Sequence, residues 1–270
     1  MAWLPVVAAT AATLGIGFGL IAWAAGPSFE NGPFHEAAER LLRSTEDTRG
    51  AQSSHEASIR VHTSTRVASA IDSTNPITRN SAVRVVAHES GAFRVEQVAH
   101  LWTHVRGHWR YVNDPQGGEY FAAASETIAN DFAGDCDDFA IVVAAMVSAV
   151  GGRARIVMMD GPDGGHAYAE ACIPDPPEEV ARRLAQYYRQ TGDRRLGQQR
   201  VDLVHFRSSV DCPVWLNLDW NAGVPGGSYM PEAWAVAIYP NRETETVAPA
   251  RLNDGDPAEE RRLVASPPGN

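Results

Sequence analysis

The apolar run Phe139–Val150 constrains the fold of this chain more than any other segment. It reads FAIVVAAMVSAV and carries no charged residue. A helix that is apolar on all sides has to be covered on all sides. Asp135 is a favourable N-cap residue before the run, and Gly151-Gly152 after it provides a left-handed C-cap. We therefore expect a helix buried in the middle of a domain.

Other segments predict the elements that would cover this helix. Apolar residues recur at helical spacing in NSAVRVVAHES and FRVEQVAHLWTHVRGHWRYV, and AAASETIAND predicts a shorter helix before the apolar run. After the run, RARIVMMD, GHAYAEACI and VWLNLDW read as strands. The pattern predicts an α+β fold in which helices pack against an antiparallel sheet.

Length and composition limit the class of protein. The 270 residues are 44% hydrophobic, which is enough for one sizeable core. The net charge of −10 argues against a general nucleic-acid binder. No C-x-x-C pair and no phosphate-binding glycine-rich motif is present, so we expect no metal site and no cofactor.

The amino terminus predicts a membrane anchor. Trp3–Ala25 is uncharged, apolar or small, and about as long as a bilayer-spanning helix. A cleaved signal peptide is the alternative, since Ala22-Trp23-Ala24 resembles a cleavage site, but the usual basic n-region is missing. We expect a single-pass membrane protein whose soluble part lies outside the cytoplasm.

The rest of the chain divides into three parts. Residues 26–74 are polar and read as a stalk or linker with one short helix, FHEAAERLLR. Residues 75–240 carry the dense apolar pattern and form the predicted domain. Residues 241–270 are polar and contain prolines, so we expect a disordered tail.

Cys136 is the candidate nucleophile, because it opens the buried helix. The unpaired N–H groups and the positive dipole end at a helix start favour a thiolate and can also hold an oxyanion. A buried structural thiol is the alternative. Asp137 and Asp138 would oppose a thiolate if they pointed at the sulfur, so we expect them to be first-turn charges turned away from it.

His166 and Asp219 are the candidate base and its orienting carboxylate. His166 begins an alternating strand after Gly164-Gly165, on the same face as Tyr168 and Glu170. Asp219 ends another alternating strand. Antiparallel pairing of the two strands would bring Asp219 beside the imidazole, where it could fix the tautomer and stabilise the cation.

The stretch from Asn75 to Tyr239 resembles the transglutaminase-like family of cysteine enzymes. The resemblance rests on four short stretches, Gly134-Asp135-Cys136, Gly151-Gly152 with Arg155, Gly165-His166-Ala167, and Trp215 to Asp219, and on HWRYVNDP upstream. It implies a papain-like α+β core, with Cys136 as nucleophile, His166 as general base and acid, and Asp219 as the orienting residue.

The chain departs from the family in the 53 residues between His166 and Asp219, where members commonly keep the two strands close. Asp175, Asp202 and Asp211 are therefore rival orienting residues. PPEEVARRLAQYYRQTGDRRLG predicts a helix within an insertion at about 174–211. Its arginines read as a solvated face, with a contact to an acidic partner or substrate as the alternative.

Cys172 and Cys212 flank this insertion, and antiparallel pairing of the two strands would bring their sulfurs near each other. Strict alternation places the two side chains on opposite faces, unless a bulge near Pro213 shifts the register. A disulfide would belong to an oxidising compartment.

These observations predict a membrane-anchored acyl-transfer enzyme that attacks protein or peptide amide bonds through a thioester. Peptidase, deamidase and transglutaminase activities share this machinery. The alternative is an inactive transglutaminase-like binding or assembly module displayed at a membrane. The expected partners are a protein or peptide substrate and, through the amino-terminal helix, the membrane, but no nucleic acid.

Overall fold

The structure is a computed structural model that describes residues 62–114, 118–191, 203–248 and 261–264, with only the backbone at 203 and 261–264. The predicted anchor at 1–25, the predicted helix FHEAAERLLR and Asp202 lie outside these residues. No helix in the described ranges is both long enough and apolar enough to cross a bilayer.

The predicted central helix is α5, Cys136–Ala149, and its side chains from Phe139 to Val147 are all buried. Asp135 occupies the N-cap position, and Gly151 has a φ of 91°, a left-handed conformation that glycine adopts without steric cost. Gly152 admits no side chain, because a Cβ there would lie 2.4 Å from the Phe93 ring. The chain therefore stops the helix where the sequence predicts.

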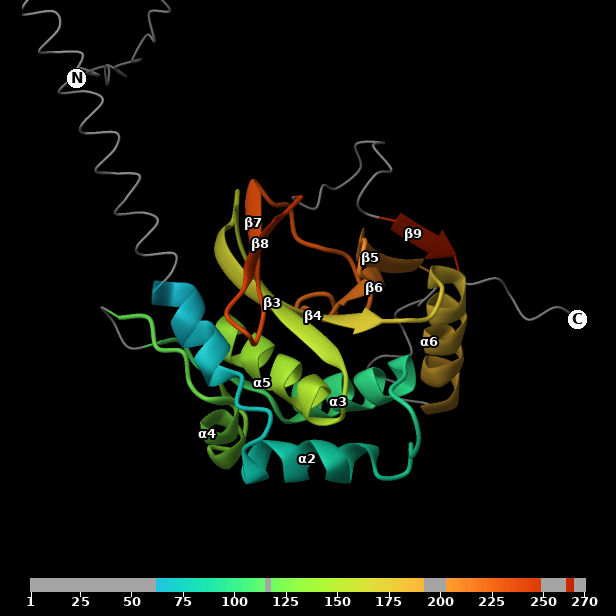
Figure 1. Ribbon diagram of the computed structural model, residues 1–270, viewed down its shortest axis with the longest axis horizontal. Helices are drawn as coiled ribbons and strands as arrows, with labels where there is room; N and C mark the ends of the chain where they lie inside the picture. Colours follow the sequence, from blue (N-terminus) through green and yellow to red (C-terminus); the bar gives the residue numbers. More distant parts are fainter. Residues whose placement is uncertain (1–61, 115–117, 192–202, 249–260, 265–270) are drawn as a thin grey trace, which may run out of the picture. The chain divides into compact units, whose positions relative to one another are not determined.

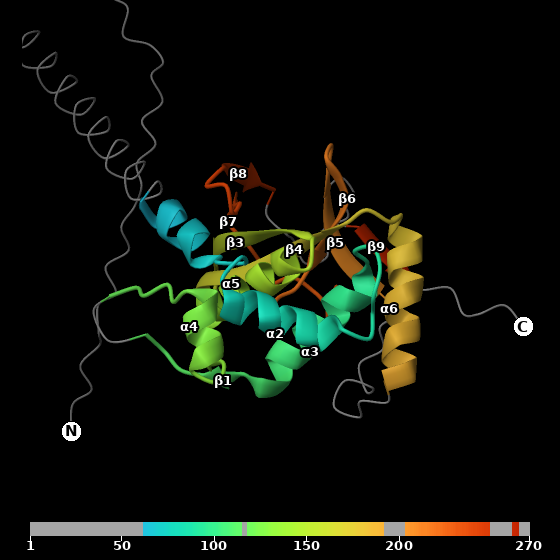
Figure 2. The ribbon, with the colours of Figure 1, turned by 60° about the horizontal axis from the view of Figure 1, so that its bottom comes forward.

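Helices cover one side of α5 (Figures 1 and 2). They are α2 (Pro76–Val86), α3 (Val95–His108) and α4 (Ala124–Ala129), and all three contact α5. The Asn75 side chain caps α2 by accepting a hydrogen bond from the Ile77 N–H. Another helix, α6 (Pro177–Thr191), packs against α3.

The sheet covers the other side of α5, through β3 (Arg153–Gly161) and β4 (Gly164–Ile173). Its strand order is β8-β7-β3-β4-β6-β5-β9, and every pairing is antiparallel. The remaining strands are β5 (Leu203–Ser209), β6 (Cys212–Asn217), β7 (Trp234–Ile238), β8 (Thr244–Val247) and β9 (Arg261–Val264). Two short strands, β1 (Arg110–Tyr111) and β2 (Ala133–Gly134), pair in parallel outside this sheet.

The pairing of β4 with β6 is antiparallel, as the sequence predicts, with Glu170 opposite Asn217. Successive side chains of β4 point to opposite faces of the sheet, so they pack into two different apolar clusters. Ala169 and Ala171 belong to the main core, which also contains the α5 side chains, whereas Tyr168 belongs to a smaller cluster with residues of β7.

The compact part of the chain extends beyond the predicted limits of 75–240. A helix covers residues 62–70, and its Val67 and Ala70 are buried in the main core. In the predicted tail, Thr244–Val247 pairs with β7 and Arg261–Val264 pairs with β5. The predicted insertion is likewise only partly helical, since Leu203–Ser209 joins the sheet. The predicted domain limits were too narrow because elements at the edge of the fold bury only one side, so their sequences are more polar than those of central elements.

A disulfide joins Cys172 and Cys212, whose Cα atoms are 5.9 Å apart. Strict alternation placed Cys172 and Cys212 on opposite faces, but alternation holds only where β4 and β6 are paired by hydrogen bonds. That pairing ends at Ile173 and Val214. Cys212 lies beyond that pair, at the start of β6, so its side chain can turn toward Cys172. Arg207 pairs with Trp215 and Ser209 with Cys212, so β6 carries one extra residue between Cys212 and Trp215, and the bulge that the sequence analysis required near Pro213 is present.

Candidate active site

His166 and Asp219 lie in direct contact. The His166 Nε2 atom is 3.0 Å from each carboxylate oxygen of Asp219, and the two side chains are 8% and 1% exposed. A carboxylate can only accept, so Nε2–H is the donor. The 53-residue interval therefore separates them in sequence but not in space.

Asp219 is held in place by its neighbours. Its backbone N–H donates to the Asn217 side-chain oxygen at 3.0 Å, and its own carboxylate accepts from the Asn221 N–H at 2.9 Å. The Trp102 indole N–H of α3 donates to the Leu218 carbonyl at 3.0 Å. These hydrogen bonds hold the backbone before and after Asp219, so contacts from outside β6 also help to orient the carboxylate toward the imidazole.

Cys136 is a free, partly exposed cysteine at the first position of α5. It lies close enough to His166 to affect the pKa of the imidazole. Burial lowers the pKa of His166, but the hydrogen bond with Asp219 and the interactions with Cys136 outweigh it and raise the pKa to about 10. The imidazole is therefore a cation at neutral pH, with a carboxylate on one side and a sulfur on the other.

The two aspartates after Cys136 lie in the first turn of α5, as expected, but both are buried, at 5% exposed. Burial, with contributions from Asp135, raises the pKa of Asp137 to about 10, so Asp137 is neutral at pH 7. Burial also raises the pKa of Asp138 to about 6, although the Ala122 N–H, 3.0 Å from its Oδ1, counteracts this. Neutralising Asp137 removes one charge that would oppose a thiolate.

An aromatic pair, Tyr111 and Trp220, adjoins these residues and was not predicted. The two rings stack at 5.2 Å between centroids, and the Arg106 guanidinium lies over Trp220 at 4.9 Å. Burial raises the pKa of Tyr111, and the charge of Cys136 adds to this effect. Their positions in the sequence could have indicated that they lie near the site, since Tyr111 belongs to HWRYVNDP and Trp220 directly follows Asp219.

The rival carboxylates have other partners. Asp175 lies 2.6 Å from Arg183, which also pairs with Glu96 of α3. Asp211 pairs with Arg153. Arg183 is thus committed to an internal ion pair rather than to the predicted solvated arginine face of the insertion.

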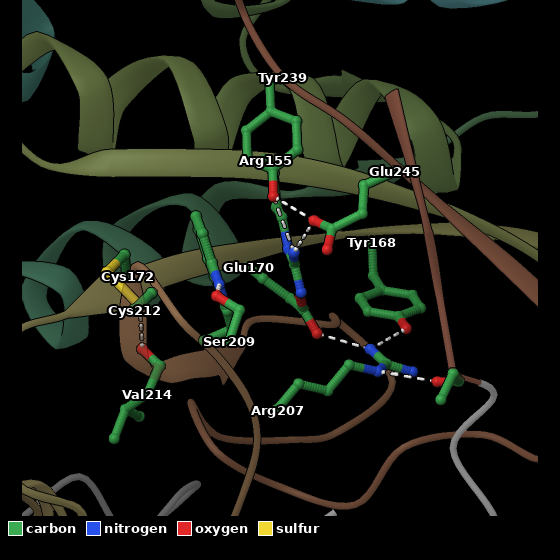
Figure 3. A network of polar contacts seen from close by, with 12 residues as sticks. Arg155, Tyr168, Glu170, Cys172, Arg207, Ser209, Cys212, Val214, Tyr239 and Glu245 are labelled. Carbon is green, nitrogen blue, oxygen red and sulfur yellow. Dashed lines mark hydrogen bonds and ion pairs between the residues drawn. A yellow bond between two sulfur atoms is a disulfide. The ribbon is translucent and has the colours of Figure 1, made fainter. Parts of the chain in front are cut away.

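A buried polar network extends from the face of β4 that carries His166 (Figure 3). Glu170 is fully buried and accepts from the Arg155 Nε at 2.7 Å and the Arg207 Nη1 at 2.6 Å. Arg207 also donates to Glu232 at 2.6 Å, and the Tyr229 hydroxyl donates to Glu170 at 2.8 Å. The network therefore ties the segment after Asp219 to the centre of the sheet.

One of three comparisons with known proteins, the match to a family model, agrees with part of this description. The profile of the family described as "Transglutaminase-like superfamily" matches residues 78–176. Curated proteins give no match. One solved structure, a "Putative Cysteine Protease from Cytophaga hutchinsonii", matches with 20% identity and a TM-score of 0.30. That match covers 36% of this chain and spans only about a third, 34%, of the other chain.

The matched segment runs from α2 to the residue before α6 and includes both Cys136 and His166. Asp219 lies beyond its end. Residues 78–176 of this chain are therefore similar to the transglutaminase-like superfamily.

Proposed function

We propose that this protein is a cysteine acyl-transfer enzyme in which Cys136, His166 and Asp219 form a catalytic triad. The observation that carries the proposal is the position of His166, whose Nε2 lies 3.0 Å from both oxygens of Asp219 and whose pKa is raised by Asp219 and Cys136 together. A nucleophile, a base and an orienting carboxylate in this order support a triad, because triads are recognised by geometry and roles and not by sequence spacing.

The first half of the reaction is acylation. The Cys136 thiolate attacks the carbonyl carbon of a carboxamide or peptide bond, and the carbonyl oxygen becomes an oxyanion. The N–H groups at the start of α5, including that of Cys136, stabilise the oxyanion. The His166 cation gives a proton to the leaving amine or ammonia as the C–N bond breaks, which leaves a thioester on Cys136.

The second half resolves the thioester. Neutral His166 takes a proton from water or from an amine, which attacks the carbonyl carbon, and the C–S bond breaks to return the thiolate. Asp219 keeps Nε2 protonated throughout, so the other ring nitrogen exchanges the proton. Water gives a peptidase or deamidase, and an amine gives a transglutaminase. Tyr111 and Trp220 provide an apolar surface beside the sulfur on which a substrate side chain can pack.

We also propose that residues 3–25 anchor the enzyme in a membrane, with the catalytic domain outside the cytoplasm and acting on protein or peptide substrates. The apolar, uncharged composition of this segment supports the anchor. The disulfide between Cys172 and Cys212 supports an oxidising compartment, because structural disulfides are rare in the cytosol.

An acylation burst tests the proposal without knowledge of the natural substrate. On mixing with p-nitrophenyl acetate, the protein should release one equivalent of nitrophenolate rapidly, and the peptide that contains Cys136 should gain one acetyl group by mass spectrometry. Cys136→Ala should abolish the burst, and His166→Ala should slow it at least 100-fold. His108→Ala, which removes an exposed histidine of α3, is the matched control.

An unchanged burst in Cys136→Ala would exclude the mechanism, and an acetylation rate for Cys136 no higher than that of a free thiol would favour the inactive binding module. Ammonia release, amine incorporation and peptide cleavage, measured in parallel on one glutamine-containing peptide, then separate the three reaction types. Each of these activities should also disappear in Cys136→Ala.

A further inference from the structure

We propose that His88, Glu89 and His100 form a binding site for a divalent transition metal, with Zn²⁺ as the preferred ion. The three residues come from the segment after α2 and from α3, among the helices that cover α5. The site is separate from the proposed triad in both residues and chemistry.

The donor atoms of the three side chains already converge. The Nε2 atoms of His88 and His100 are 3.1 Å apart, and the Glu89 Oε1 atom lies 3.7 Å from the His100 Nε2. All three donor atoms lie within 4.8 Å of one another. Two bonds of about 2.0–2.1 Å at a tetrahedral angle place their nitrogen atoms about 3.3 Å apart, so the imidazoles need little movement to share one ion.

Glu89 is arranged so that one oxygen stays available. Its Oε2 accepts from the Arg94 Nη2 at 2.7 Å, whereas Oε1 faces His100. The backbone carbonyl of Glu89 accepts from the Gln97 side chain at 2.8 Å, which holds the segment against α3. An anionic ligand whose other oxygen is paired is the usual arrangement around a bound metal.

His100 also has the outer partner that metal-binding histidines usually have. The Tyr187 hydroxyl of α6 lies 3.1 Å from the His100 Nδ1, and the two rings are perpendicular at 4.7 Å between centroids. Such a contact fixes the ring and leaves Nε2 as the ligand atom. This contact is an observation independent of the cluster itself, and it is the one expected if Nε2 binds a cation.

The donor set favours zinc. Two imidazoles and one carboxylate suit Zn²⁺, whereas Ca²⁺ and Mg²⁺ prefer oxygen ligands alone. His88 is exposed, which allows the ion to enter and leaves room for water as a fourth ligand. A bound ion would join the α2–α3 connection to α3 and, through Tyr187, to α6, so it would stabilise the helical layer.

The sequence prediction of no metal site did not find this cluster. That prediction rested on short ligand spacings, and no short spacing joins His88 to His100. His88 lies twelve positions before His100, and only the turn between α2 and α3 brings the two together. No local motif signals such a pair.

Zinc titration tests the site in the full chain carrying Cys136→Ser, so that the free thiol cannot bind the ion. The protein is stripped with EDTA, dialysed and titrated with Zn²⁺ in competition with a chromophoric chelator. We expect one equivalent to bind. His88→Ala should weaken binding at least 30-fold, and Tyr187→Phe, an outer-partner change, about tenfold.

His104→Ala is the matched control, because it removes a histidine of the same helix that lies outside the cluster, and it should leave the affinity unchanged. Co²⁺ provides a second readout, since a tetrahedral site gives visible absorption that His88→Ala should remove. The proposal is overturned if no stoichiometric binding occurs, if His88→Ala binds as tightly as the parent, or if His104→Ala causes an equal loss. A simple hydrogen bond between the two imidazoles would give the first of these results.

Discussion

At the scale of single residues, burial and polar partners shift the pKa of His166 in opposite directions. Burial alone would make the imidazole neutral, but Asp219 and Cys136 favour the cation strongly enough to raise the pKa to about 10. The raised pKa of a histidine adds stability that is fully present below about pH 6.5 and is lost as the pH rises through about 10. The resting site is thus an ion pair throughout the neutral range.

Asp137 leads to a prediction at the same scale. Its pKa is raised to about 10 in the folded protein and returns to about 3.8 on unfolding, so the unfolded chain releases a proton above pH 4. The free energy of unfolding therefore falls between about pH 4 and 10 because of this one carboxyl group. Asp137→Asn should stabilise the protein at pH 8 by roughly 1–3 kcal/mol and have little effect at pH 4.

Urea unfolding of the parent and of Asp137→Asn at both pH values measures this difference. Asp163→Asn, on the exposed turn between β3 and β4, is the control and should change neither value. A loss of stability in Asp137→Asn at pH 8 would show that the ionised carboxylate is needed, contrary to this account.

At the scale of elements, β4 connects the candidate site to the buried network. His166, Tyr168 and Glu170 occupy every second position of β4 and so lie on the same face of the strand. The negative charge of Glu170 is balanced by ion pairs with Arg155 and Arg207. Burial would raise the pKa of Glu170, but the two arginines and the hydrogen bonds lower it overall. A lowered carboxyl pKa contributes stability above about pH 4.5 that is lost as the pH falls through the native value.

Glu170→Gln should therefore destabilise the protein strongly. It leaves two buried guanidinium groups without their shared anion, and breaking a buried ion pair in this way costs about 3–5 kcal/mol. Glu178→Gln, on the exposed side of α6, should change stability by less than about 0.5 kcal/mol. Thermal unfolding at pH 7 compares the two, and equal midpoints would show that the network contributes little.

Sequence patterns predicted the elements whose burial is uniform or strictly alternating. α5 is apolar on all sides, and β3, β4 and β6 alternate, so their positions follow from spacing alone. β5 and β8 were missed because they carry charged residues. In β5 the charge belongs to Arg207, which is buried only because Glu170 and Glu232 neutralise it. A pairing between distant residues of this kind leaves no local signal.

The candidate site was predictable to a similar extent. The helix start at Cys136, the strand position of His166 and the strand end at Asp219 all carry local signals. Their contact depended on the antiparallel pairing of β4 with β6, which the alternation suggested. Tyr111 and Trp220 were not predicted, because their stacking joins β1 to the turn after β6 and depends on the tertiary fold.

At the scale of the molecule, the disulfide closes the segment that contains α6 and β5. Cys172 and Cys212 are 40 residues apart, and a loop of that length corresponds to about 4 kcal/mol of lost entropy in the unfolded chain. Reduction should therefore lower the thermal midpoint by several degrees. A Cys172→Ala/Cys212→Ala variant should melt at the lower temperature with or without reductant.

Comparing parent and variant in the presence and absence of reductant measures this contribution, and Cys136→Ala serves as the control for the free thiol. Its midpoint should respond to reductant as the parent does. A parent midpoint that does not change on reduction, with both thiols then shown to be free, would contradict the stabilising role.

The central claim is that Cys136 and His166 form a thiolate–imidazolium pair, and the rate of iodoacetamide alkylation of Cys136 between pH 5 and 9 tests it most directly. The account predicts that at pH 6 Cys136 is alkylated much faster in the parent than in His166→Ala, because the His166 cation lies beside the sulfur. In His166→Ala the rate should be low at pH 6 and rise toward pH 9, as for an ordinary thiol with a pKa near 8.5. Identical profiles for the parent and His166→Ala, both rising only near pH 8.5, would contradict the claim.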